Sequence, residues 1–240
     1  MLLMGCCSLA SAQTLIPKIT IGVDQANRPQ DLAVAIQILL LITILALAPA
    51  ILVMMTSFTR LIIVLHFLRQ ALGTQTMPPN QVIIGLALFL TFFIMSPTIE
   101  KIHEQCWKPL QAEQITSQQA LDGAGKSLKE FMLRQTREKD LALFVGMAKL
   151  EKPQSPMDLP LKVVIPGFIN SELRIGFQIG FLLYLPFLII DMVVASVLMP
   201  MGMLMLPPIM ISLPFKLLLF VLADGWYLMV QSLVEGFKVG

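Results

Sequence analysis

Uncharged apolar stretches alternate with one charge-rich stretch along the chain. Residues 32–59 contain no Asp, Glu, Lys or Arg, and residues 175–223 contain only Asp191 and Lys216. Residues 100–172, by contrast, hold 20 of the 32 charged residues, ten acidic and ten basic. The pattern predicts an all-α protein in which two membrane-associated apolar hairpins, over 32–99 and 173–240, flank a polar, mostly helical region over 100–172.

The first hairpin contains two uncharged segments of spanning length, 32–59 and 82–99, each long enough for a ~30 Å hydrocarbon core. Pro49 predicts a kink in the first of them. Between the segments, the stretch from Arg60 to Arg69 predicts a short amphipathic helix at the membrane interface. Its apolar residues recur at helical spacing: Leu61, Ile62, Leu65 and Leu68.

The polar region reads as helix with breaks. Leu-Asp-Gly-Ala-Gly at 121–125 predicts a loop, and residues 126–149 predict amphipathic helix on both sides of the charged patch 134–140. Four prolines predict that this helix ends and that an extended connector follows: Pro153, Pro156, Pro160 and Pro166.

The second hairpin is predicted from two apolar segments, 175–199 and 209–234, joined by the sequence PMGMLMLPP. The residues of this joining sequence that interrupt a helix are Pro200, Gly202, Pro207 and Pro208. Its apolar residues include Met201, Met203, Leu204 and Met205. An apolar loop exposed to water is unfavourable, so we expect it to be buried against copies of the chain or partner proteins. Methionine is flexible enough to form a deformable seal on a pore rim, or it simply fills space between helices.

Charged residues inside apolar segments need partners. Asp191 and Lys216 lie at similar depth on either side of the loop, so we expect an ion pair that locks the hairpin or two subunits; a proton relay is the alternative. Asp224 is predicted to act as an interfacial anchor beside Trp226 and Tyr227. Glu172 and Arg174 flank the third apolar segment and are expected to pair between subunits.

Composition narrows the class of protein. The chain is 56% hydrophobic and 13% charged, against about 25% charged in soluble domains. Disordered chains are poor in apolar residues, and a net charge of +2 provides no basic surface for nucleic acid. A membrane protein or a deeply buried oligomer subunit remains.

The N-terminus and the basic residues indicate an orientation. Residues 1–12 end in Ala-Ser-Ala and predict a cleaved signal peptide, followed by a short periplasmic segment over 13–31. Arg60 and Arg69, in a short connection, favour the cytoplasm. The polar region is then expected in the periplasm.

Motifs for catalysis, cofactors or metals do not stand out in the sequence. His66 and His103 have no nucleophile at a suitable spacing, and Cys106 has no Cys or His partner at metal-ligand spacing. We therefore expect no enzyme, no cofactor and no metal site. A membrane aspartyl hydrolase using Asp191 and Asp224 is a minor alternative. A secondary transporter is another, because it would also place charges and broken helices near the midplane.

Three stretches resemble one family. They are SFTRLIIVLHFLRQALGTQTMPPNQVIIGLALFLTFFIMSP at 57–97, INSELRIGFQIGFLLYLPFLIIDMVVASVLMPMGMLMLPP at 169–208 and LPFKLLLFVLADGW at 213–226. Together they are similar to the FliP family of flagellar type III export proteins. The resemblance implies a pore-forming core subunit of the export gate in the bacterial inner membrane, at the flagellar basal body and raised towards the periplasm.

The same resemblance implies partners and a seal. Copies of the chain would assemble with two smaller companion membrane proteins into a closed cone, among other export apparatus proteins, and unfolded flagellar proteins would pass through it. The family's methionine gasket falls on Met203, Leu204 and Met205, where Leu204 interrupts a methionine run and Met201 offers a replacement side chain.

Overall fold

A computed structural model describes residues 29–74, 76–150, 155–200 and 207–237, and in the first helix it describes side chains from residue 36 onward. These residues form helices, turns and short connections without a strand, which confirms the all-helical prediction. The α-helices are α1 (Pro29–Met54), α2 (Phe58–Ala71), α3 (Asn80–Ile102), α4 (Lys108–Gln111), α5 (Ser117–Gln135), α6 (Glu138–Met147), α7 (Leu161–Leu198), α8 (Pro208–Leu222) and α9 (Gly225–Glu235). A π-helical turn, His103–Trp107, follows α3, and a 3-10 turn, Pro156–Asp158, precedes α7.

The chain divides into two compact units, residues 1–46 and 47–240. In the first unit, the described side chains of residues 36–46 are all exposed. They carry no charge, so this helix needs lipid or protein around it. In the second unit α1 continues through Pro49 to Met54 without a break in helical assignment.

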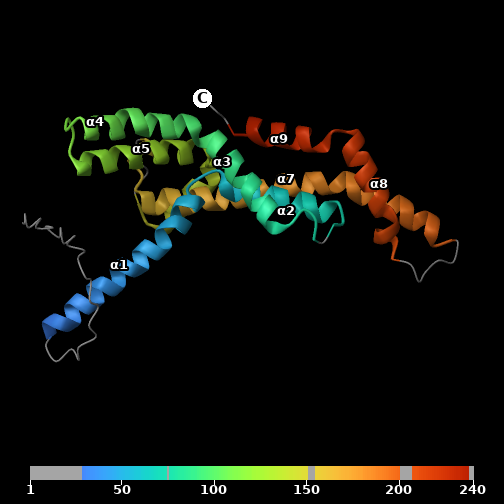
Figure 1. The fold of residues 1–240 in the computed structure, drawn as a ribbon, viewed down its shortest axis with the longest axis horizontal. Helices are drawn as coiled ribbons and strands as arrows, with labels where there is room; N and C mark the ends of the chain where they lie inside the picture. The colour runs from blue at the N-terminus through green and yellow to red at the C-terminus, as the bar shows by residue number, and fades with distance from the viewer. Residues whose placement is uncertain (1–28, 75, 151–154, 201–206, 238–240) are drawn as a thin grey trace, which may run out of the picture. The chain divides into compact units, whose positions relative to one another are not determined.

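The core of the second unit forms where α2 packs along α7 (Figure 1). One face of α2 is buried: Leu61, Val64, Leu65, Leu68 and Ala71. The helix predicted over 60–69 is confirmed, but its expected role at the membrane interface is wrong, because α2 is a central core element. An amphipathic face suits a membrane surface or another helix equally well, and here α7 supplies the apolar surface.

A second apolar cluster joins α5 and α6 to the first turns of α7. Met132, Val164 and Phe168 are fully buried there, and the Phe131 and Phe168 rings meet edge to face with centroids 6.0 Å apart. The charged region 100–172 therefore has apolar contacts of its own, and its charges lie largely on the outside.

The loop predicted at 121–125 is wrong, because α5 is helical throughout this stretch. Thr116 and Gln119 form a reciprocal capping box that fixes its N-terminus. A Cβ at Gly123 would lie 2.7 Å from Cys106 Sγ, so the glycine permits close packing against the π-helical turn.

Helix α7 starts earlier than predicted and crosses residue 172, the position at which the charge pattern separates the polar region from the second hairpin. Pro166 lies inside α7, at the sixth residue of the helix, and it does not belong to the connector. Residues 151–154, which include Pro153, lie outside the described residues.

The single helix predicted over 209–234 is two helices. Helices α8 and α9 meet at an angle of 64°. Asp224 at this bend has φ 49° and ψ 50°, the left-handed conformation, which Asp adopts more readily than most residues.

Three helices of the described residues are long and apolar enough to cross a membrane. They are the helical stretches Ile36–Met54, Asn80–Gln111 and Leu161–Leu198, and the bent α8–α9 pair would make a fourth. These helices are counted as candidate membrane spans by their length and composition.

Candidate functional site

An ion pair between buried Lys216 and partly exposed Asp191 joins α7 and α8. Lys216 Nζ lies 2.6 Å from Asp191 Oδ2 and donates a second hydrogen bond of 3.2 Å to the carbonyl of Ala71. Ser212 Oγ donates to the other carboxylate oxygen, Asp191 Oδ1, at 2.5 Å. The two charges that the sequence places at equal depth are thus in contact within one chain.

The burial of Lys216 explains why it has two polar partners, Asp191 and the carbonyl of Ala71. The residue is 2% exposed, and a buried ammonium is tolerated only when paired and hydrogen-bonded. Ala71 is the last residue of α2, where free carbonyls and the helix dipole favour a cation. Lys216 therefore ties α8 to α2 as well as to α7.

A second ion pair corrects an expectation about Glu172. This carboxylate was expected to pair between subunits, but it is fully buried and accepts two hydrogen bonds from Arg60, of 2.8 and 2.5 Å. It is therefore already paired inside its own chain. Arg174, its expected companion in subunit contacts, lies on the exposed side of α7.

Arg60 also reaches the C-terminal end of α9. Its guanidinium donates to the carbonyl of Gly236 at 3.2 Å and to Gln135 at 3.4 Å, and it lies 3.8 Å from the centroid of the Phe237 ring. Arg60 is 2% exposed, so it is a core residue. Of the two arginines from which the orientation was predicted, Arg69 is the one that retains partial exposure.

The Met-rich loop lies outside the described residues at Met201, Gly202, Met203, Leu204 and Met205. Its flanks are described: α7 ends at Leu198, Pro200 and Pro207 are exposed, and Pro208 opens α8. The methionines on these flanks are exposed as well: Met192, Met199 and Met210.

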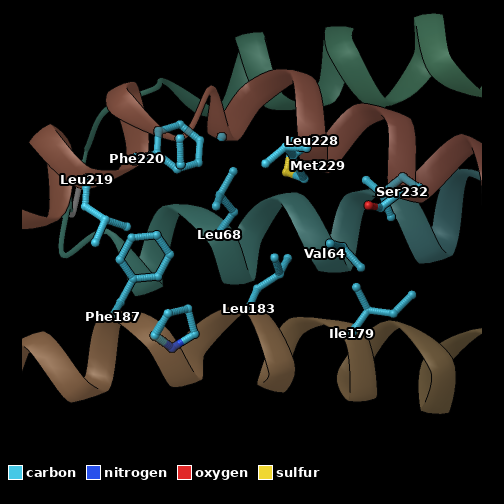
Figure 2. A pocket seen from close by; sticks show the side chains of 14 residues that line it. Val64, Leu68, Ile179, Leu183, Phe187, Leu219, Phe220, Leu228, Met229 and Ser232 are labelled. Carbon is cyan, nitrogen blue, oxygen red and sulfur yellow. The ribbon is translucent and has the colours of Figure 1, made fainter.

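An apolar cavity of about 290 Å³ lies between α2, α7 and the bent α8–α9 pair. Figure 2 shows Val64 and Leu68 reaching it from α2, Leu183 from α7 and Met229 from α9. Phe187 and Phe220 close one end, with ring centroids 6.4 Å apart. The bend at Asp224, which is itself exposed, folds α9 back over this space.

A polar cavity of about 450 Å³ lies beside the Asp191–Lys216 pair, lined also by His66, Arg69 and Tyr184. Arg69 Nη2 lies 3.2 Å from His66 Nδ1. Arginine only donates, so this bond requires a neutral imidazole with its proton on Nε2. Burial, and next the Arg69 charge, lower the pKa of His66.

Sequence reasoning did not assign roles to Ser212, His66 or Tyr184. The spacing of His66 and Arg69 on one helix was a usable signal, because residues three apart share a face. The sequence carried no signal that Tyr184 lines the same cavity, because its position there depends on how α2 packs on α7. Within the described ranges, no group of three or more His, Cys, Asp or Glu could hold a metal ion.

Comparison with known proteins gives one consistent result. The family model described as the FliP family matches residues 41–233. Flagellar biosynthetic protein FliP of Bacillus subtilis is 56% identical, over 90% of this chain and 98% of its own length. The proteins of that name from Pectobacterium carotovorum and Aquifex aeolicus are 54% and 51% identical, over 88% and 93% of this chain and 82% and 92% of their own. The match spans the second hairpin and most of the described residues, and we conclude that the chain belongs to the FliP family of flagellar biosynthetic proteins.

Proposed function

We propose that the chain is a pore-forming subunit of the flagellar type III protein export gate, with Met201, Met203, Leu204 and Met205 of the loop over 200–208 as its seal. Membership of the FliP family supports a role in flagellar biosynthesis. Several apolar helices support a location in the inner membrane at the flagellar base. The formation of a pore and its sealing by the loop go beyond this role and location, and they are the content of the proposal.

The observation that carries the proposal is the α7–α8 hairpin. The Asp191–Lys216 pair and the Ala71 carbonyl fix the two helices just below the loop. Exposed methionines flank the loop on both helices, with Met199 59% and Met210 73% exposed. A hairpin that is tied by an ion pair and whose connecting sequence is rich in methionine, an unbranched apolar side chain, fits a constriction that excludes water and ions and yields to a passing chain.

The partners belong to the proposal as well. Copies of the chain, with two smaller companion membrane proteins and other export proteins, would cover part of the exposed apolar surface of α3, α7 and α8, and lipid would cover the rest. Unfolded flagellar proteins would be the transported substrates, with the charged region 100–172 on the periplasmic side. The role is that of a conduit, and no catalytic step is assigned to any residue.

Replacing Met201, Met203 and Met205 together with Ala tests the seal. The shortened side chains should leave a gap, so we expect resting cells to lose potassium and membrane potential. The matched control replaces three exposed methionines elsewhere with Ala: Met77, Met147 and Met157. Unchanged ion permeability and unchanged secretion in the loop variant would refute the seal.

A secondary transporter is the second candidate, since the bent α8–α9 pair and an ion pair between apolar helices also occur in such proteins. Purified protein in vesicles separates the two functions. We expect no concentrative uptake of small solutes, and uptake that depends on Asp191 would favour the transporter.

A further inference from the structure

The polar cavity at the α2–α7–α8 junction has the features of a ligand site. It measures about 450 Å³, within the range of small-molecule pockets. Its lining combines Lys216, a buried cation, with Arg69 on a neighbouring helix. Gly73 at its edge has φ +76°, and a Cβ there would approach Lys216 Nζ at 4.0 Å.

Donors at the cavity exceed those that the protein's own bonds use. Lys216 has three N–H groups, and its bonds to Asp191 and Ala71 take two. Arg69 has five, and its bonds to Pro78, Asn80 and His66 take three. Further N–H groups on both cations are thus available to an oxygen-rich ligand.

The charge of the site selects the ligand. Arg69 and Lys216 are cations, Asp191 is an anion, and His66 is neutral while it accepts from Arg69. The site thus carries one net positive charge, which matches the single negative charge of a phosphodiester. A doubly charged free phosphate would be less well balanced and would also lie near the Asp191 carboxylate.

The rim of the cavity indicates what is attached to that phosphodiester. Ile209 lines the cavity and is 57% exposed. A polar cavity that has an exposed isoleucine among its lining residues and lies between helices of membrane-spanning composition suits a headgroup with acyl chains.

We propose that this cavity binds the phosphodiester headgroup of a membrane phospholipid. Arg69 and Lys216 contact the phosphate, Tyr184 and His66 Nε2 donate further hydrogen bonds, and the acyl chains lie along α7 and α8. The bound lipid thus holds α2, α7 and α8 together at the base of the hairpin. The proposal shares the Asp191–Lys216 pair with the proposed gate, but it does not depend on the gate, because it concerns lipid binding in this cavity and not the sealing by the loop over 200–208.

Native mass spectrometry of the detergent-extracted protein, titrated with dioleoylphosphatidylglycerol, tests the proposal. Arg69→Gln removes charge-assisted hydrogen bonds to the phosphate, so we expect binding to weaken about tenfold or more. Arg174→Gln removes an equal charge from an exposed position of α7 and should bind as the unchanged protein does. Tyr184→Phe removes one hydroxyl and should weaken binding a few-fold, which keeps the test open if Arg69→Gln does not fold.

Two further ligands separate the sources of binding. Dioleoylglycerol has the same chains without the phosphate and should bind at least tenfold more weakly; equal binding would overturn the headgroup site. Inorganic phosphate at the same concentration should not displace the lipid, and full displacement would show a site for a free anion. Equal lipid binding by the Arg69→Gln and Arg174→Gln proteins would overturn the proposal.

Discussion

Glu172 illustrates how much one buried charge depends on its partner. It is fully buried and accepts both of its close hydrogen bonds from Arg60, which also contacts Gly236 and Phe237. The pair therefore connects α2, α7 and the C-terminal end of α9. Buried ion pairs add little net stability over apolar packing. The contribution of the Arg60–Glu172 pair is therefore to hold these elements in one arrangement.

Glu172→Gln should lower the free energy of unfolding by about 3–5 kcal/mol, because it leaves the Arg60 charge buried without a counter-charge. Denaturant unfolding in detergent measures this. Glu130→Gln is the matched control: Glu130 pairs with Arg134 where both side chains are 41% exposed, so its loss should cost less than about 1 kcal/mol. Equal losses for the two variants would contradict the role of the Arg60–Glu172 pair.

His66 gives the protein a predicted dependence on pH. Its folded pKa lies below its usual value, owing to burial and then to Arg69. As the pH falls through about 6.5, His66 binds a proton in the unfolded chain, whereas in the folded chain it is still neutral. Stability from this residue is therefore present above pH 6.5 and is lost as the pH falls from there to the lowered folded pKa.

The thermal unfolding midpoint in detergent, followed from pH 7.5 to 5, checks this. We expect the midpoint to fall over that range and to fall less in His66→Asn, which cannot titrate and retains an acceptor for Arg69. Identical pH profiles for the two proteins would exclude His66 as the source.

At the scale of elements, glycines set how closely α2 and α7 approach. A Cβ at Gly180 would lie 2.5 Å from Phe67 Cγ, and one at Gly176 would lie 3.2 Å from Ile63 Cγ2. The Phe67 ring also meets Phe177 edge to face, with centroids 5.3 Å apart. A stripe of small residues on α7 thus receives the large side chains of α2.

Gly180→Ala should therefore destabilise the protein by roughly 1–3 kcal/mol, the usual cost of overpacking. Gly125→Ala is the control, since it lies inside α5 with nothing within 4 Å of the added Cβ; it should be neutral or stabilising by up to about 1 kcal/mol. Thermal and denaturant unfolding in detergent compare them. A Gly180→Ala protein as stable as the Gly125→Ala protein would contradict close α2–α7 packing.

At the scale of the whole chain, exposed apolar side chains are the dominant feature. Phe89, Phe92 and Phe93 on α3 and Phe181 on α7 are each at least 62% exposed. Lipid covers some of this surface in a membrane, and association covers the rest. We expect the protein extracted in mild detergent to contain several copies of the 26.6 kDa chain.

Light scattering that separates protein mass from detergent mass measures the number of chains in the extracted particle. A multiple of the chain mass is expected, alone or with companion proteins. A single-chain mass across several mild detergents would contradict the association.

Local pattern determined part of this structure. The helical class, the long apolar helices and the FliP resemblance follow from runs and spacings that are read within one stretch. The Asp191–Lys216 contact follows from counting equal distances from a loop along two helices. Each depends on near neighbours in sequence, and local rules carry that information.

The tertiary structure decided the rest. Arg60 and Glu172 are 112 residues apart, and no spacing rule joins them. The apolar face of α2 was equally suited to lipid and to α7, so its role as core depended on where α7 lies. The polar cavity beside the Asp191–Lys216 pair exists because α2, α7 and α8 converge. The sequence determines which charged side chains need a partner, and packing in three dimensions determines which partner each one has. The physical reason is that a charge is tolerated in the interior only where the fold brings an opposite charge or a hydrogen-bonding group within bonding distance.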